Sequence, residues 1–170
     1  TPSYQSGDTD TDDELDAGEV WVFAVTYVVD AGDPDPLVNT VIVQGADGDN
    51  VPFTVTDTHS LSVDYQPVLA VAKTGPASAD VGDTVTYTYG VSHDALSDGS
   101  PISSIGVDDD ITGAAGYTSG DDGDSLLESG ETWFFTDSYV VQPTDPNPLV
   151  NTATVGGRDL DGELLLMTDT

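Results

Sequence analysis

The chain has 170 residues, with 32 acidic residues against two basic ones, a net charge of −30 and no cysteine. A surface of this charge repels nucleic acid and anionic lipid and attracts divalent cations, so we expect neither nucleic-acid binding nor membrane insertion. The absence of cysteine excludes a disulfide framework and thiol chemistry. Apolar residues make up 37% of the chain and alternate with polar ones, which predicts folded β-sheet rather than disorder.

An acidic stretch near the start of the chain has the ligand spacing of an EF-hand-type calcium loop, in which alternate side chains point inward and the last carboxylate closes the cage. Position 6 of the loop is Asp13 instead of glycine, and a strand pattern follows with no helix on either side, so this is not an EF-hand domain. The alternative is a solvated acidic turn. Counted from the first ligand, the predicted calcium ligands at positions 1, 3, 5, 7, 9 and 12 are Asp8, Asp10, Asp12, Glu14, Asp16 and Glu19. Position 7 of such loops ordinarily contributes its backbone carbonyl, so the Glu14 side chain is the doubtful member.

The segments that follow read as β-strands separated by turns. Residues 20–29 form an alternating strand pattern in which every second residue shares one face: Trp21, Phe23, Val25, Tyr27 and Val29. A turn rich in proline, glycine and aspartate leads to a second strand at 37–43, and residues 45–50 form a hairpin turn before a strand that reaches Val63.

A longer series of strands comes next. We expect strands at 68–73, 84–91 and 102–107, followed by three aspartates at 108–110 and a loop over 113–120. A second acidic stretch then begins, in which Gly120 falls at loop position 1 when counted back from the last glutamate. Its predicted ligands are Asp121, Asp122, Asp124, Glu128 and Glu131.

The second acidic stretch and the strands after it repeat the first. Trp21 corresponds to Trp133, an offset of 112 residues, and half of the positions are identical when residues 15–58 are aligned with 127–170. The predicted fold is all-β: tandem β-sandwich repeats of about 112 residues, arranged head to tail. Residues 1–66 would be the C-terminal part of one repeat, and 67–170 a second repeat that lacks the end of its last strand.

Half of a sandwich exposes an apolar face and open strand edges. We therefore expect residues 1–66 to be completed by a segment equivalent to 68–116. That segment would come either from a longer polypeptide or from a neighbouring subunit.

No arrangement of residues points to catalysis. His59 and His93 have polar surroundings without a partner nucleophile and are interpreted as surface residues. Trp21 and Trp133 are interpreted as core, and the asparagines after Leu-Val, Asn39 and Asn151, as buried amides bonded to a neighbouring backbone. The aspartates at 108–110 are either a solvated turn or additional cation ligands.

Three segments resemble a known family. The segments are Gly82-Asp83-Thr84-Val85-Thr86-Tyr87 and Val150-Asn151-Thr152-Ala153-Thr154, together with Lys73-Thr74-Gly75-Pro76. They are similar to the Ig-like conserved repeat of bacterial and archaeal cell-surface proteins, the domain-of-unknown-function eleven class. The usual Asn-Thr-Gly at one strand end is replaced here by Ser92-His93-Asp94. The resemblance implies a long extracellular array that forms stalks, adhesins or surface fibres, without catalytic activity.

These observations favour a structural repeat of an extracellular fibre, filament or adhesin stalk at the cell surface, stiffened by calcium. Its partners would be neighbouring repeats of the same chain or identical subunits. The alternative is an adhesive module whose loop tips recognise a glycan or a partner protein. Repetition of the same aromatic residues favours the structural role.

Overall fold

The computed structural model describes residues 1–170, which form β-strands, turns and loops without a helix. No helix with the length and hydrophobicity needed to cross a membrane is therefore present. The chain divides into two compact units, Thr1–Asp30 and Ala31–Thr170. All strand pairs are antiparallel, which agrees with the predicted all-β class and is consistent with a β-sandwich.

The first unit contains one small sheet. Strands β1 (Ser3–Ser6) and β2 (Val22–Ala24) pair antiparallel around the acidic loop that joins them. The Tyr4 ring packs edge-on against Trp21 and Phe23, with ring centroids 5.6 and 5.7 Å apart. The strand predicted over 20–29 is too long, because only the residues paired with β1 acquire ladder hydrogen bonds.

The second unit begins with a long hairpin, as the turn signal predicts. Strands β3 (Leu37–Ala46) and β4 (Pro52–Leu61) pair along their whole length. Asp47 closes the turn by accepting hydrogen bonds from the backbone N–H groups of Asp49 and Val51 at 3.0 and 2.9 Å. These are the local side-chain-to-backbone bonds that favour aspartate in turns.

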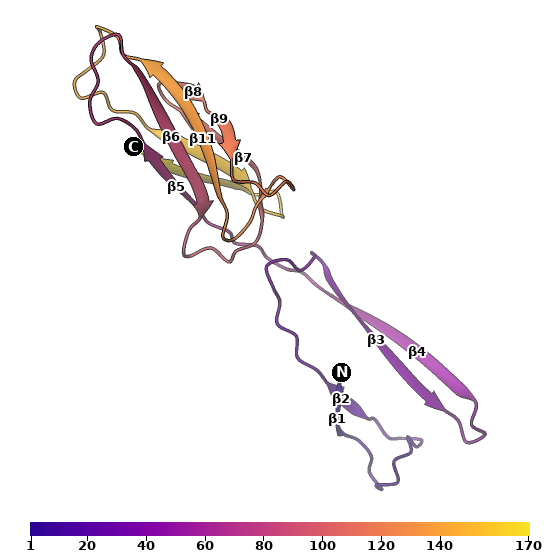
Figure 1. Ribbon diagram of the computed structural model, residues 1–170. Coiled ribbons are helices and arrows are strands. Elements are labelled where there is room, and N and C mark those ends of the chain that lie inside the picture. The colour runs from indigo at the N-terminus through magenta and orange to yellow at the C-terminus, as the bar shows by residue number, and fades with distance from the viewer. The chain divides into compact units, whose positions relative to one another are not determined.

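One layer of the sandwich is a four-stranded sheet in the order β5-β6-β11-β9. Its central pair, β6 and β11, lies side by side in Figure 1 and is in register over nine residues, from Thr132↔Ser92 to Val140↔Thr84. The strands are β5 (Leu69–Thr74), β6 (Thr84–His93), β9 (Gly116–Ser119) and β11 (Thr132–Val140).

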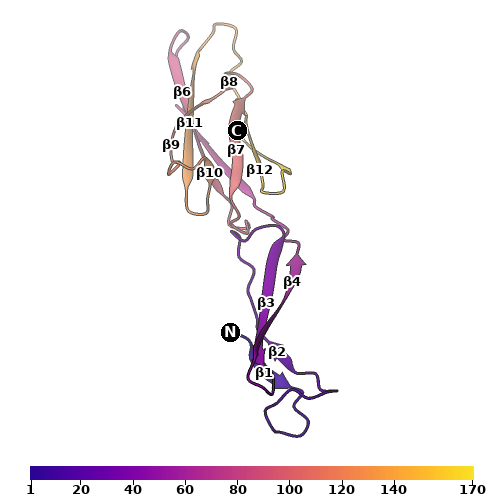
Figure 2. The ribbon, with the colours of Figure 1, turned by 90° about the vertical axis from the view of Figure 1, so that its right-hand side faces the viewer.

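The other layer is a sheet in the order β10-β7-β12-β13, with the short strand β8 paired to β7. Figure 2 separates this layer, labelled at β7 and β12, from the layer that holds β6, β9 and β11. The strands are β7 (Ile102–Asp109), β8 (Gly113–Ala114), β10 (Leu126–Leu127), β12 (Ala153–Arg158) and β13 (Leu164–Asp169). The loop predicted over 113–120 is wrong, since β8 and β9 lie there and use the free edges of β7 and β11.

The core fills the space between the two layers. Alternate residues of each strand point inward, as in Val85, Tyr89 and Val91 of β6. The buried cluster consists of Leu69, Tyr89, Val91, Ile102, Val107, Leu127, Trp133, Phe135, Ala153 and Val155.

The matching residues of the first copy are not buried in this way. Phe23 is 53% exposed, whereas Phe135 at the equivalent position is 4% exposed. Val43 is 52% exposed, whereas its equivalent Val155 is fully buried. Phe135 lies on β11, which pairs with β6, and Val155 lies on β12, which pairs with β7. Residues 1–66 contain no counterpart of β6 or β7 against which the same side chains could pack.

Candidate metal centre

The first acidic loop is closed by its last residue, Glu19. Its Oε1 atom accepts hydrogen bonds from the backbone N–H and the hydroxyl of Thr9, both at 2.7 Å. Its Oε2 atom accepts from the Asp16 backbone at 3.2 Å and from Nε1 of Trp21 at 3.1 Å. One carboxylate therefore ties the two ends of the loop together. These bonds stabilise the ionised form, so the backbone and hydroxyl of Thr9, followed by the Asp16 backbone, lower the pKa of Glu19 to about 2.

The curl of the loop comes from Asp8 and two left-handed residues. Asp8 accepts hydrogen bonds from the backbone N–H groups of Thr11 at 2.6 Å and Asp13 at 3.1 Å. Thr11 and Asp13 have φ of 66° and 63°. Asp13 occupies the position at which an EF-hand has glycine, and aspartate is among the residues that adopt this backbone most readily.

The curl brings carboxylates together in two overlapping groups. Oxygens of Asp8, Asp10 and Glu19 lie within 4.8 Å of one another, and so do those of Asp10, Asp12 and Asp16. Five of the six predicted ligands are thus close to at least two others. Glu14 belongs to neither group, in keeping with the doubt about its side chain.

Asp10 lies at the centre of this negative cluster. It is the one residue shared by both carboxylate groups. Desolvation, followed by repulsion from Asp12, Glu19, Asp16 and Asp8, raises its pKa. A cation at this position would relieve the repulsion, because its charge opposes that of each neighbour.

The second acidic loop is closed in the same way. Glu131 accepts hydrogen bonds from the backbone of Asp122 at 3.2 Å, the backbone of Glu128 at 3.1 Å and Nε1 of Trp133 at 3.1 Å. Two carboxylate groups form here as well, Asp121 with Asp122 and Asp124, and Asp122 with Glu128 and Glu131. All five predicted ligands of this loop therefore belong to a group.

A tyrosine fixes which residue begins each loop. The Tyr4 hydroxyl accepts a hydrogen bond from the Asp8 backbone at 2.8 Å, and the Tyr117 hydroxyl accepts one from Asp121 at 2.9 Å. Asp121 therefore takes the place of Asp8. Gly120 fell at loop position 1 only when counted back from Glu131, and the tyrosine contact replaces it there with Asp121, in keeping with a second loop that is one residue shorter than the first.

The glycine before each of these aspartates is required by the backbone. Gly120 has a φ of +123°, and a Cβ atom there would lie 2.2 Å from the Thr132 carbonyl oxygen. Gly7 shows the same conformation and the same close approach to Val20. Both loops thus pass close to the strand that follows them, which holds the first and last acids near each other.

The two loops can hold a metal ion through carboxylate oxygens alone. No histidine or cysteine belongs to any of the acidic groups. Hard oxygen donors suit Ca²⁺, Mg²⁺ or Mn²⁺ better than zinc or copper. Exposed acids can also cluster without an ion, so the choice of metal rests on the loop spacing.

Two other interpretations of single residues change in the structure. His93 is half-buried rather than a surface residue, and its ring nitrogens lie 2.7 Å from the Ser97 hydroxyl and 2.9 Å from the Leu127 carbonyl. Asn151 is buried as expected, but its amide bonds to no backbone, and the equivalent Asn39 is exposed. Trp133 is core, at 6% exposure.

The sequence did not reveal the role of Lys73 and Asp109. Nζ of Lys73 lies 3.2 Å from Oδ2 of Asp109, with side chains 5% and 0% exposed. The available signal was a lysine on the inward face of an alternating strand, in phase with Leu69 and Val71. None of the aspartates at 108–110 belongs to a carboxylate group. Asp109 is buried and paired, whereas Asp108 and Asp110 are exposed, so the solvated-turn interpretation is wrong for Asp109 alone.

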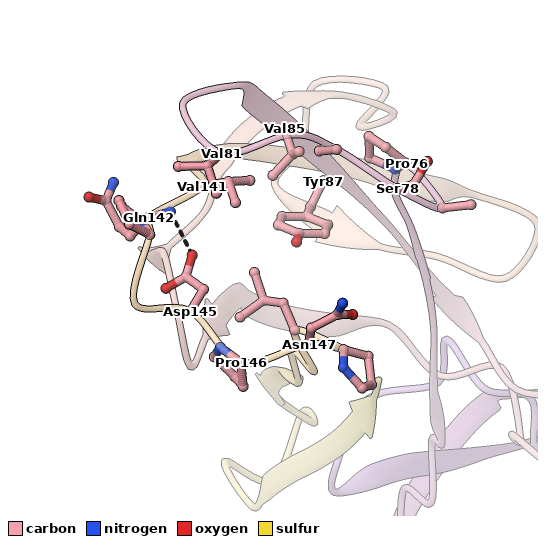
Figure 3. A pocket seen from close by; sticks show the side chains of 15 residues that line it. Pro76, Ser78, Val81, Val85, Tyr87, Val141, Gln142, Asp145, Pro146 and Asn147 are labelled. Carbon is pink, nitrogen blue, oxygen red and sulfur yellow. Dashed lines mark hydrogen bonds between the residues drawn. The ribbon is translucent and has the colours of Figure 1, made fainter.

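A pocket of about 410 Å³ lies between the loop after β5 and the loop after β11. Figure 3 shows the Tyr87 ring pointing into it, opposite Asp145 and Asn147. Asp145 is held by the backbone N–H of Gln142 at 2.8 Å and by the Tyr139 hydroxyl at 2.9 Å. The pocket therefore offers an aromatic ring beside fixed polar groups.

Comparison with models of protein families, with curated proteins and with solved structures finds no match.

Proposed function

We propose that this chain is a structural repeat of an extracellular fibre, filament or adhesin stalk, in which calcium bound by the acidic loops stiffens Ig-like β-sandwich units. The supporting observation is that two loops with different sequences each gather their carboxylates around a closing glutamate at the equivalent position, Glu19 in the first loop and Glu131 in the second. Calcium is the cation proposed because flexible loops of carboxylate oxygens with this spacing are its usual ligands.

Structural use of the metal is supported by where the loops lie. Each closing glutamate bonds the indole of the tryptophan two residues later, Trp21 or Trp133. Trp133 belongs to the core of the sandwich. A cation that neutralises the loop would therefore stabilise the packed end of β11. A ligand that binds only the folded state raises its stability by mass action.

The calcium assignment is tested by titration calorimetry on matched variants of the first loop. Asp10→Asn should abolish binding at that loop, because Asp10 is shared by both carboxylate groups and accepts no hydrogen bond needed for the curl. Glu14→Gln, from the same loop but outside both groups, should bind as the unaltered chain does. Equal binding by the two variants, or no heat with calcium in the unaltered chain, would reject the proposed site.

A structural role for calcium requires a second test, which measures stability. Removal of calcium with a chelator should lower the melting temperature of the unaltered chain. A melting temperature that does not move, in a chain shown to bind calcium, would leave a metal site but no structural function for it.

Assembly into an array is supported by the exposed side chains of residues 1–66. Phe23, Val41 and Val43 are 53%, 45% and 52% exposed, and their equivalents Phe135, Ala153 and Val155 are buried beneath partner strands. The occupant we propose is a segment of the same type as β5, β6 and β7. That segment would come from a neighbouring repeat of the same polypeptide or from an identical subunit.

The array is tested by joining a second copy of residues 67–116 ahead of Thr1. Backbone amides of β3 and β4 should become protected in hydrogen exchange, and the Trp21 fluorescence should shift to the blue as its ring is buried. The control is a fusion of the same segment with Val85, Tyr89 and Val91 replaced by serine. Protection that is absent in the first fusion, or equal in the two, would contradict the array.

An adhesive module is the second candidate, supported by the pocket of Figure 3. Tyr87 beside Asp145 and Asn147 has the combination of an aromatic face and polar groups that suits a glycan. Binding to a glycan array that is lost in Tyr87→Ala and kept in Phe134→Ala, a change on an exposed face of β11, would favour this function.

A further inference from the structure

The sandwich contains a buried polar cluster that the calcium loops do not use. Lys73, on β5, is the only lysine of the chain, and its ammonium lies 3.2 Å from Asp109 at the end of β7. Tyr89, directly opposite Lys73 in the β5–β6 pair, donates a 2.6 Å hydrogen bond to the same Oδ2 atom of Asp109. Two side chains of one layer therefore meet a carboxylate of the other in the interior.

The register between β7 and β12 places a carboxamide next to this cluster. Ala153 of β12 is opposite Asp109, and the pairing continues one residue further, since the Asp110 backbone donates to the Thr152 carbonyl at 3.0 Å. Side chains alternate along the chain, so Asn151 shares the inward face with Ala153. Asn151 is 6% exposed, and neither its Oδ1 nor its Nδ2 atom has a hydrogen-bond partner. A buried amide without partners is unusual, because such groups are nearly always satisfied.

We propose that Lys73 and Asn151 form an intramolecular isopeptide bond, with Asp109 as the group that transfers the protons. Lys73 and Asn151 belong to opposite layers, so the bond would join the two sheets of the sandwich. The proposal concerns only the second unit and is independent of whether the acidic loops bind calcium.

The reaction needs no oxidant or cofactor. The Lys73 ammonium gives a proton to the Asp109 carboxylate across the ion pair, and the neutral Nζ then attacks Cγ of Asn151. A new Nζ–Cγ bond forms, and protonated Asp109 returns its proton to Nδ2 as the Cγ–Nδ2 bond breaks. The departing nitrogen also takes the remaining proton of the amine and leaves as ammonium. The lysine ammonium and the asparagine amide are thereby converted into one secondary amide and one free ammonium ion. Exclusion of water favours the proton transfer from Lys73 to Asp109, because it destabilises the ammonium–carboxylate pair relative to the neutral amine and carboxylic acid.

The side-chain carbonyl carbon of Asn151 is a better electrophile for the Lys73 amine than that of Asp109. Oδ1 of Asp109 accepts hydrogen bonds from the backbone of Ile111 and Thr112 at 3.0 and 3.1 Å, in addition to the bond from Tyr89 to Oδ2. These contacts favour the carboxylate form of Asp109 except while it carries the transferred proton, and a carboxylate is a poor electrophile. The amide of Asn151 has no such contacts, and its nitrogen is a leaving group once protonated.

The first test is the intact mass of the unaltered chain at isotopic resolution. The proposal predicts a mass lower than that of the sequence by one ammonia molecule. The full sequence mass would mean that Lys73 and Asp109 form only an ion pair, and a loss of one water would mean that Asp109 is the acceptor. Either result overturns the proposal.

The second test uses trypsin, for which Lys73 and Arg158 are the only cleavage sites. In the denatured chain a free lysine gives three fragments, whereas an acylated lysine leaves residues 1–158 intact. Loss of ammonia with cleavage after Lys73 would indicate cyclisation of an asparagine on its own backbone, and would overturn the proposal. Fragmentation of the uncut product should place the link between Lys73 and Asn151.

Matched variants complete the design. Asn151→Ala should have its full sequence mass and be cleaved after Lys73, whereas Asn39→Ala, the equivalent exposed position of the first copy, should keep the loss of ammonia. Loss of ammonia in Asn151→Ala would overturn the assignment. If Asn151→Ala fails to fold, the mass and the tryptic fragments of the unaltered chain still decide the question.

Discussion

The hydroxyl of Tyr89 donates a 2.6 Å hydrogen bond to Oδ2 of Asp109, and this bond connects the two layers of the sandwich inside its core. Both side chains are almost completely buried, at 0% and 2% exposure. Burial, followed by the hydrogen bond to Asp109, raises the pKa of Tyr89, so the tyrosine is a proton donor across the usual pH range. The carboxylate in turn depends on its donors, because its side chain is fully buried.

Tyr89→Phe should therefore lower the free energy of unfolding by about 1.5–3 kcal/mol, the usual range for a hydrogen bond to a charged group. Urea denaturation measures the change. The control is Tyr87→Phe on the same strand, whose ring lies 4.9 Å from Nζ of Lys73 and keeps that contact without its hydroxyl. Equal losses of unfolding free energy in the two variants would show that the hydrogen bond from Tyr89 to Asp109 stabilises the fold no more than the Tyr87 hydroxyl does.

Phe23 and Phe135 provide a test of burial with identical side chains. Phe135→Ala removes a core residue and should cost about 3–5 kcal/mol, whereas Phe23→Ala should cost far less. The reason is that Phe135 is 4% exposed and Phe23 is 53% exposed. Thermal unfolding of the two variants provides the comparison, and a similar cost at both positions would mean that the first copy is packed in solution.

The approach of each acidic loop to the following strand can be tested at Gly120. Gly120→Ala places a Cβ 2.2 Å from the Thr132 carbonyl oxygen at a φ of +123°. We expect a loss of more than about 1 kcal/mol. Gly116→Ala is the matched control, since its Cβ would meet nothing closer than 3.8 Å. Circular dichroism melts should separate the variants, and an unaffected Gly120→Ala would be inconsistent with the close passage.

A pH dependence should come from Asp98, which fastens the chain ahead of β5 to the loop after β6. Burial acts to raise its pKa, but hydrogen bonds from the backbone of Gln66 and from the backbone and hydroxyl of Ser100 outweigh it, so the pKa is lowered. A carboxyl with a lowered folded-state pKa stabilises the fold above its ordinary value of 3.8, and this contribution is lost as pH falls through the folded-state pKa.

The stability difference between the unaltered chain and Asp98→Asn should accordingly be constant near neutral pH and shrink below pH 3.8. Denaturation at a series of pH values measures the difference. Comparing the two proteins at each pH cancels the repulsion among the many other acids. A difference that grows on acidification would show that the sign is wrong.

Local patterns in the sequence predicted much of this protein. Alternation along β6 and β11 requires one face of each strand to be apolar, whatever the partner, so strands and inward residues such as Trp133 follow from the order of amino acids alone. The acidic loops are also local, because a curl over a few residues brings Asp8, Asp10 and Glu19 together. The same reasoning placed Glu14 as the doubtful ligand.

Partners far away in the chain could not be predicted in this way. The strand over 20–29 and the loop over 113–120 were wrong because a strand exists only where a neighbouring edge supplies hydrogen bonds. The pairing of Lys73 with Asp109 and the burial of Asn151 depend on which layers face each other.

Comparison of the two copies distinguishes what local sequence determines from what tertiary structure determines. Phe23 and Phe135 both follow a Gly-Glu-x-Trp-x pattern, so periodicity assigns them the same inward face. Only the tertiary structure decides that Phe135 is buried and Phe23 is not, because β6 and β7 lie against the second copy alone. Burial is a property of the partner surface as well as of the residue, and that surface comes from strands distant in sequence.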